Sequence, residues 1–184
     1  MKRFVLSLLA AFAVCVGVSA QKAVSRGSKP SKVFVAYFSA TGNTAEAARK
    51  IAAATGGRLH EIVPEKRYTA ADLDWRDKKS RCTVEMHNLK FRPALKEKKS
   101  DLSSYSVVYL GYPIWWNIAP TIINSFIESN DLKGKTVIPF ATSGGSGIAN
   151  SVAQLKKLYP SLKWGNGKLL NYASDNDIRK WVGK

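Results

Sequence analysis

The sequence predicts an α/β protein in which a parallel β-sheet carries helices on both faces. Short, continuous apolar runs typical of buried strands alternate with helical patterns, and loops of small residues join them. The chain has 184 residues, of which 45% are hydrophobic. A chain of about 150 residues already buries roughly 70% of its unfolded surface, so one domain with a substantial core is expected. This composition excludes disordered and collagen-like chains.

The first 20 residues have the order of a secretory signal peptide. Two basic residues precede an apolar run at residues 4–18, and the small pair Ser19-Ala20 follows it. The run is shorter than the roughly 20 residues of a spanning helix, which disfavours the alternative of a retained membrane anchor. We therefore expect a signal peptide over residues 1–20, a flexible leader over residues 21–31 and a domain over residues 32–184. The mature protein would be exported, without a transmembrane segment, and periplasmic.

A first β-α-β unit opens this domain. Residues 33–38 are a continuous apolar run rich in β-formers, which predicts a strand covered on both faces. Residues 45–55 predict an alanine-rich helix that stops at Gly56-Gly57. Residues 59–63 predict the second strand.

The same pattern continues to the C-terminus. Further strands are expected at residues 107–110, at residues 136–141 and within residues 162–170, and further helices at residues 120–129, 148–159 and 175–182. Ser174 and Asp177 have the spacing of a capping box for the last helix. Between the two halves, residues 65–103 are highly charged and lack a sustained apolar period. We expect an irregular crossover there, with helical structure around residues 68–75 and again between residues 81 and 99.

The loop after the first strand has the chemistry of a phosphate site. Ser39, Thr41, Asn43 and Thr44 surround Gly42 immediately before a helix. Their side chains and the free backbone N–H groups converge at the positive end of the helix dipole, where a phosphate dianion is favoured. No lysine lies between Ser39 and the end of the loop, which disfavours a P-loop nucleotide triphosphatase. A merely capped helix would need only one of these hydroxyl groups.

Three loops in order resemble those of the flavodoxins. Phe38-Ser39-Ala40-Thr41-Gly42-Asn43-Thr44 resembles their FMN-phosphate loop. The two flavin-ring loops of a bacterial flavodoxin-like branch are similar to Gly111-Tyr112-Pro113-Ile114-Trp115-Trp116-Asn117 and to Phe140-Ala141-Thr142-Ser143-Gly144-Gly145-Ser146-Gly147. The resemblance covers nearly all of the mature chain.

This resemblance implies a three-layer, doubly wound parallel sheet of five strands in the order 2-1-3-4-5, with FMN bound where the winding reverses. It implies three groups of cofactor-binding residues. The phosphate would be held by Ser39, Ala40, Thr41, Gly42, Asn43 and Thr44, one edge and face of the flavin ring by Tyr112, Pro113, Ile114, Trp115, Trp116 and Asn117, and the pyrimidine edge by Thr142, Ser143, Gly144, Gly145 and Gly147. No catalytic acid or base is implied, because FMN performs the chemistry.

The two tryptophans bear on the reaction. Adjacent side chains do not readily share one apolar side, so we expect one of Trp115 and Trp116 to stack on the flavin. The second ring loop has no aromatic residue, so one flavin face is open unless Tyr172 or the crossover covers it. An open face accepts a stacked nicotinamide or quinone, whereas a covered one suits electron transfer. Both alternatives stand: an electron-transfer flavoprotein or an NAD(P)H-dependent FMN oxidoreductase.

The charge balance points to negatively charged partners. The formal net charge is +16, and loss of Lys2 and Arg3 with the signal peptide would leave +14. We expect an acidic redox protein or a small-molecule electron donor or acceptor as partner. No nucleic-acid-binding motif accompanies the charge, and no cysteine and histidine set has metal-site spacing, so neither nucleic acid nor a metal is expected. A second hypothesis is a non-catalytic flavodoxin-like module whose basic surface binds an anionic ligand or acidic partner.

Overall fold

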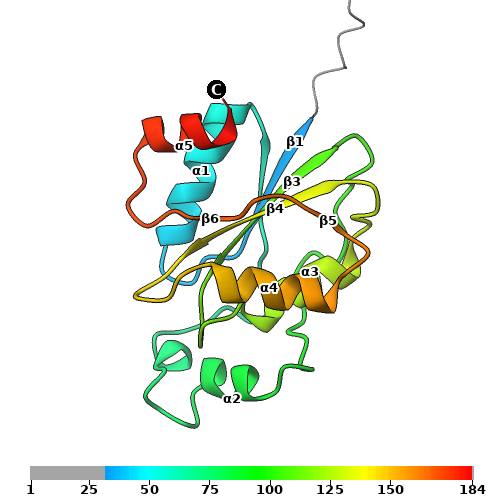
Figure 1. Cartoon of the computed structure of the whole chain (residues 1–184). Helices are drawn as coiled ribbons and strands as arrows, with labels where there is room; N and C mark the ends of the chain where they lie inside the picture. The colour runs from blue at the N-terminus through cyan, green and yellow to red at the C-terminus, as the bar shows by residue number, and fades with distance from the viewer. Residues whose placement is uncertain (1–31, 184) are drawn as a thin grey trace, which may run out of the picture.

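A computed structural model describes residues 32–183 of the chain (Figure 1). The predicted signal peptide and leader lie outside the described residues. Within this range, a parallel sheet has the strand order β2-β1-β3-β4-β5, with β6 also paired to β4. The strands are β1 (Val33–Tyr37), β2 (Arg58–Glu61), β3 (Val107–Pro113), β4 (Thr136–Thr142), β5 (Lys163–Trp164) and β6 (Lys168–Leu169). The predicted order 2-1-3-4-5 is confirmed.

The fifth position of the sheet holds two short strands in place of one. Thr136 of β4 is in register with Lys163 of β5, and Phe140 of β4 with Lys168 of β6. Between them the chain stays against β4, because the Gly165 N–H donates to the Val137 carbonyl at 2.8 Å. The glycine-containing segment expected within residues 162–170 thus interrupts the strand without leaving the sheet.

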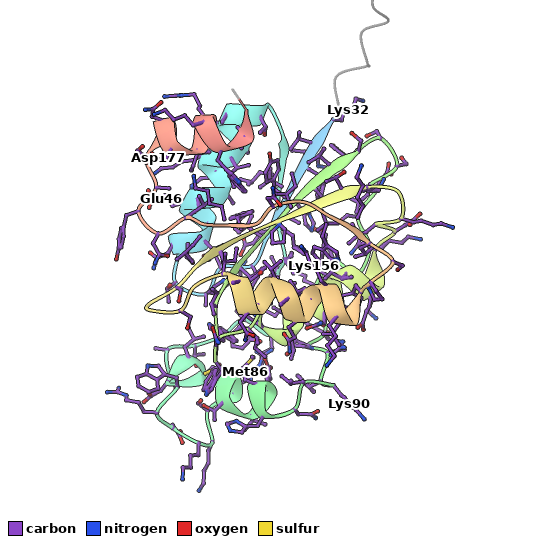
Figure 2. The ribbon with its side chains drawn as sticks, in the orientation of Figure 1. Lys32, Glu46, Met86, Lys90, Lys156 and Asp177 are labelled. Atoms are coloured by element: carbon purple, nitrogen blue, oxygen red, sulfur yellow. The ribbon has the colours of Figure 1, made fainter. Side chains whose placement is uncertain are left out.

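Helices cover both faces of the sheet, as predicted. On one face lie α1 (Asn43–Thr55) and α5 (Asp175–Val182), and on the other α3 (Thr121–Ser129) and α4 (Ala149–Leu158). Figure 2 shows Glu46 of α1 and Asp177 of α5 on one side of the sheet and Lys156 of α4 on the other. The capping box of α5 is confirmed: the Ser174 hydroxyl accepts from the Asp177 N–H while Asp177 accepts from the Ser174 N–H.

The core consists of two apolar clusters, one on each face. Successive side chains of a strand point to opposite faces. In β1, Phe34 and Ala36 accordingly pack in the cluster that contains Ile122 of α3, whereas Val35 packs with Ile51 of α1. These residues are buried, which explains why the strand reads as a continuous apolar run.

Packing in the sheet is closest beside the C-terminal end of β3. A Cβ atom at Gly111 would lie 2.1 Å from Cζ of Phe140, the neighbouring residue on β4. A glycine is required there because the Phe140 ring occupies the place of a side chain. This contact holds the ends of β3 and β4 together where their loops begin.

The crossover between β2 and β3 contains a short 3-10 helix, η1 (Ala71–Leu73), and α2 (Arg81–His87). Helical structure fills only the first seven residues of the range expected between residues 81 and 99. The chain then returns to pair with the segment that follows β2. The Glu65 N–H donates to the Ala94 carbonyl at 2.8 Å, and the Lys96 N–H donates to the Val63 carbonyl at 2.9 Å. Figure 1 shows α2 beyond the carboxyl ends of the strands. No helix within residues 32–183 is long and apolar enough to cross a membrane.

Candidate functional site

Three loops meet around a cavity of about 300 Å³ at the carboxyl ends of β1, β3 and β4. Parallel strands present their carboxyl ends at one edge of the sheet, which is where ligands bind in doubly wound folds. The lining includes residues from all three predicted loops: Thr41, Asn43, Pro113, Ile114, Trp115, Thr142, Ser143 and Gly144. It also includes two further segments: the first turns of α1 at Glu46, Ala47 and Lys50, and residues 170–173 before α5, of which only Tyr172 was considered from the sequence.

The loop before α1 presents backbone N–H groups to this cavity. Gly42 has a φ of 96°, in the left-handed region that favours glycine. The Ser39 hydroxyl accepts from the N–H groups of Gly42 and Ala45 at 3.1 and 3.2 Å, which holds the loop in a tight curve. Within residues 32–183, the N–H groups of Thr41, Asn43 and Thr44 have no acceptor. These free donors, at the positive end of a 13-residue helix, fit a phosphate group.

The hydroxyl groups of this loop have different surroundings. Thr41 and Asn43 are exposed and line the cavity. Thr44 is buried, and its hydroxyl lies 2.7 Å from that of Thr142 at the end of β4. Thr44 therefore joins the loop before α1 to the end of β4. Ala40 borders a second cavity, on the side of the crossover.

The loop after β3 makes a tight two-residue turn. Trp115 and Ile118 exchange two backbone hydrogen bonds of 3.0 Å. The residues between them, Trp116 and Asn117, have φ values of 46° and 65°. Two left-handed residues in succession define a type I′ turn. The Asn117 carbonyl also accepts from the Asn150 side chain of α4 at 3.1 Å, which anchors the tip of the turn.

The tight turn separates the two tryptophan side chains. Trp115 is half-buried, with its ring edge-on to Phe38 at 5.6 Å and to Tyr68 at 5.4 Å between ring centroids. Trp116 is 43% exposed. Trp115 borders both cavities, whereas Trp116 borders the crossover side and does not line the 300 Å³ cavity. Tyr112, also predicted at the site, is fully buried; its hydroxyl lies 3.1 Å from that of Ser151, and burial raises its pKa to about 12.

The second cavity, of about 450 Å³, lies between the loop after β3 and the crossover. Its lining carries no charged residue: Ala40, Thr41, Leu73, Trp75, Cys82, Pro113, Ile114, Trp115 and Trp116. The two cavities therefore share Thr41 and residues 113–115 as a common wall. One side of that wall is polar and leads to the helix N-terminus; the other is apolar.

The crossover is attached to the common wall by a buried polar cluster. Glu85 of α2 is buried and accepts from the Tyr68 hydroxyl and, at 2.6 Å, from Arg81 Nε. The Arg81 guanidinium lies 4.0 Å above the Tyr68 ring, and that ring meets Trp115. Burial, together with the hydrogen bond to Glu85, holds the pKa of Tyr68 well above its ordinary value. These contacts attach α2, through the Tyr68 ring, to Trp115 of the common wall.

Two side chains that sequence reasoning did not find also hold the site in place. Asn171 accepts from the Ser143 N–H at 2.8 Å and donates to the Ser143 carbonyl at 2.7 Å, as a paired strand would. Lys50 forms an ion pair of 2.9 Å with Glu46 and donates to the Ala173 carbonyl at 3.0 Å. No local signal marks their role at the site, because the contacts of Asn171 with Ser143 and of Lys50 with Ala173 join residues far apart in the sequence.

The loop after β4 is held by its own serine. The Ser143 hydroxyl accepts from the N–H groups of Gly145 and Ser146 at 3.1 and 2.8 Å. A Cβ atom at Gly144, Gly145 or Gly147 would meet nothing within 4 Å, so the backbone here is open to a close approach. Gly144 lines the cavity; Gly145 and Gly147 lie outside its lining. The open backbone on one side and the free N–H groups on the other fit a phosphorylated ring compound such as FMN.

Comparisons with known proteins agree with this geometry. The family model of the flavodoxins matches residues 32–184. A provisionally assigned flavoprotein of Bacteroides uniformis is 56% identical, with a TM-score of 0.82 over 85% of this chain and 100% of that one. One of Bacteroides eggerthii is 59% identical, with a TM-score of 0.81 over 83% and 96%. A Lactobacillus acidophilus flavoprotein solved in complex with FMN is 22% identical, with a TM-score of 0.65 over 83% and 99%, and shows the same fold.

No curated protein matches the chain. The match of the family model over the whole described range, together with the sheet order 2-1-3-4-5, decides the assignment. The chain belongs to the flavodoxin family.

Proposed function

We propose that this protein binds FMN and acts in redox chemistry, as an electron-transfer flavoprotein or a small flavin oxidoreductase. One observation carries the proposal: a single cavity has free N–H donors at the start of α1 and, beside them, the loops after β3 and β4. Neighbouring strands are about 4.8 Å apart, so the ends of three strands span roughly the width of a tricyclic ring. The fold relative from Lactobacillus acidophilus was solved with FMN.

Each of the three loops would bind a different part of FMN. Residues 39–44 would hold the phosphate, residues 113–117 the ring face and residues 142–147 its pyrimidine edge. FMN supplies the electron and hydride chemistry when bound, whereas the chain orients it and limits its contact with water. No protein acid or base is assigned.

The second cavity supports a small-molecule redox partner. It adjoins the ring-binding wall and its lining carries no charge, which favours a flat, uncharged group such as a quinone or a nicotinamide ring. The net charge of +16 supports acidic protein partners as well, since it steers them electrostatically. From the order of the first 20 residues, we further propose that the protein is exported and acts in the cell envelope.

An absorbance spectrum of the purified protein, recorded before and after addition of FMN, tests the proposal. Anaerobic titration with NADPH and then with dithionite follows. Flavin bands that bleach with NADPH identify an oxidoreductase, and bleaching with dithionite alone identifies an electron carrier. Absence of flavin uptake contradicts the redox function and leaves the binding-module hypothesis.

A pair of variants tests the placement of the phosphate. Thr41→Ala removes an exposed hydroxyl at the cavity and should weaken FMN binding roughly tenfold, as loss of a hydrogen bond to a charged group would. Ser161→Ala removes an exposed hydroxyl far from the three loops and should leave the Kd unchanged. Equal Kd values for both variants would place the phosphate elsewhere.

A further inference from the structure

A groove beside α2 adjoins the apolar cavity. Its volume is about 810 Å³, and Trp75 and Trp116 border both the groove and the 450 Å³ cavity. The other lining residues come from the segment before α2, from α2 itself and from its C-terminal end: Arg76, Lys78, Thr83, Val84, His87 and Asn88. Because two side chains border both spaces, a ligand in the apolar cavity can extend into the groove.

The groove exposes large apolar side chains. Trp75, Val84 and Trp116 are 70%, 56% and 43% exposed. Exposed apolar side chains that gather at one place mark a binding site for a ligand or partner. The Trp116 ring lies edge-on to that of His87, with 6.4 Å between ring centroids, and His87 Nδ1 donates to the Thr83 carbonyl at 2.7 Å. Contacts with α2 thus hold one aromatic wall of the groove in place.

The charged side chains that line the groove are positive. They are Arg76 and Lys78, and none of the described residues in the lining is acidic. Asp74, outside the lining, accepts from Arg76 Nε at 3.1 Å, whereas the two terminal guanidinium nitrogens donate to no protein atom within residues 32–183. Lys78 forms no ion pair in the same range. The nearby Asp77 carboxylate accepts from the Lys79 N–H. The groove therefore offers free cationic donors beside an aromatic wall.

We infer that the small-molecule redox partner of this site is a flat, uncharged ring compound that carries an anionic arm, a carboxylate or a phosphate. The ring occupies the apolar cavity, and the arm passes Trp75 and Trp116 into the groove, where Arg76 and Lys78 bind it. Guanidinium and ammonium groups form charge-assisted hydrogen bonds with both kinds of anion. This inference rests on the proposed function, because the apolar cavity adjoins the proposed ring-binding wall. A neutral compound with an apolar tail would leave both cations without a partner.

The test compares an acid with its ester on the full-length protein loaded with oxidised FMN. The acid is a methylnaphthoquinone with a propanoate side chain, and the ester is its uncharged methyl ester. Oxidised FMN passes no electrons to a quinone, so isothermal titration calorimetry measures both Kd values without turnover. The acid should bind more tightly than the ester. Addition of about 1 M NaCl should reduce this preference, because salt screens exposed charges.

Variants locate the anionic arm. Lys78→Gln should weaken binding of the acid about 2- to 5-fold, the range of an exposed ion pair, and should leave the Kd of the ester unchanged. Arg76→Gln should act in the same way. Lys156→Gln removes an equal charge from an exposed position of α4 that does not line the groove, and should change neither Kd. Trp75→Ala should weaken both ligands, since Trp75 borders both spaces.

Titration with NADP⁺ distinguishes two sources of the anion. Binding of NADP⁺ that weakens in Lys78→Gln identifies a pyridine dinucleotide, and preference for the acid over the ester identifies a carboxylated quinone. Equal Kd values for acid and ester, without binding of NADP⁺ that depends on Lys78, would overturn the inference. Equal losses in Lys78→Gln and Lys156→Gln would also overturn it, as would a protein that holds FMN and binds none of the three ligands. Failure of the parent protein to take up FMN would instead contradict the proposed function.

Discussion

The hydroxyl groups of Thr44 and Thr142 lie 2.7 Å apart, and both residues are buried. Thr44 belongs to the first turn of α1 and Thr142 is the last residue of β4, so this hydrogen bond joins the predicted phosphate loop to the predicted pyrimidine loop. This pair of side chains thus links two of the three loops directly. Its loss should affect stability and ligand binding together.

Valine substitutions test this pair. Thr44→Val or Thr142→Val alone leaves one buried hydroxyl without its partner and should cost about 1 to 3 kcal/mol in the free energy of unfolding. The double variant removes both hydroxyls and keeps the shapes, so it should be more stable than the sum of the single losses predicts. Urea unfolding of the four proteins measures the coupling. Strict additivity would show that the two hydroxyls do not stabilise each other.

The left-handed glycines at the two ends of α1 provide a matched pair. Gly42 has a φ of 96° and Gly56 a φ of 66°, and a Cβ atom at either would meet nothing within 4 Å. Alanine at each position should therefore cost about 1 kcal/mol in unfolding free energy through backbone strain alone. Only Gly42→Ala should also weaken FMN binding, because Gly42 curves the loop that presents the free N–H groups. Weaker binding in Gly56→Ala as well would attribute the effect to α1 as a whole.

Replacement of Glu85 should loosen the crossover. Glu85→Leu removes the buried carboxylate that accepts from Arg81 Nε and from the Tyr68 hydroxyl, and should cost about 3 kcal/mol in unfolding free energy. Tyr68→Phe removes one hydrogen bond to the carboxylate and should cost about 1 to 2 kcal/mol. Glu65→Leu is a matched change at an exposed crossover residue and should stay within about 0.5 kcal/mol of the parent. Guanidinium unfolding distinguishes the three, and equal stability of the two leucine variants would contradict a structural role for Glu85.

Protonation of His60 should reduce stability below neutral pH. Its ring packs against Phe34 and Phe126, with centroids 5.3 and 6.1 Å away, and burial lowers its pKa below the ordinary 6.5. The unfolded chain therefore takes up a proton near pH 6.5 while the folded chain does not, so stability is lost as the pH falls through this range. His60→Gln should flatten the dependence of the unfolding midpoint on pH between pH 7.5 and 5.5. An unchanged slope would assign the effect to other groups.

Much of the architecture could be predicted from local patterns. The apolar run at residues 33–38 contains β1, and the alanine-rich stretch before Gly56 contains α1. The capping box at Ser174 marks the start of α5, because its hydrogen bonds join residues three positions apart. These signals are local: they depend on periodicity, on helix caps and on glycine backbone.

The crossover was less predictable because its structure depends on pairing between distant segments and on a buried charged residue. A glutamate is expected at the surface because of its charge. Glu85 is nevertheless buried, since its carboxylate accepts from Arg81 and Tyr68. Helix α2 ends at His87, and residues 94–96 then pair with residues 63–65. Neither outcome has a local signature.

The sequence by itself determined the order of strands and helices and the three polar or aromatic loops at the carboxyl ends of the sheet. Only the tertiary structure decided which of the two tryptophans borders both cavities, and that Asn171 and Lys50 belong to the site. The reason is physical: these positions depend on contacts such as Asn171 to Ser143, 28 residues apart, Thr44 to Thr142, 98 apart, and Lys50 to Ala173, 123 apart. Such contacts follow from the register of β4 and β6 and the packing of α1 beside α5, which no local pattern encodes.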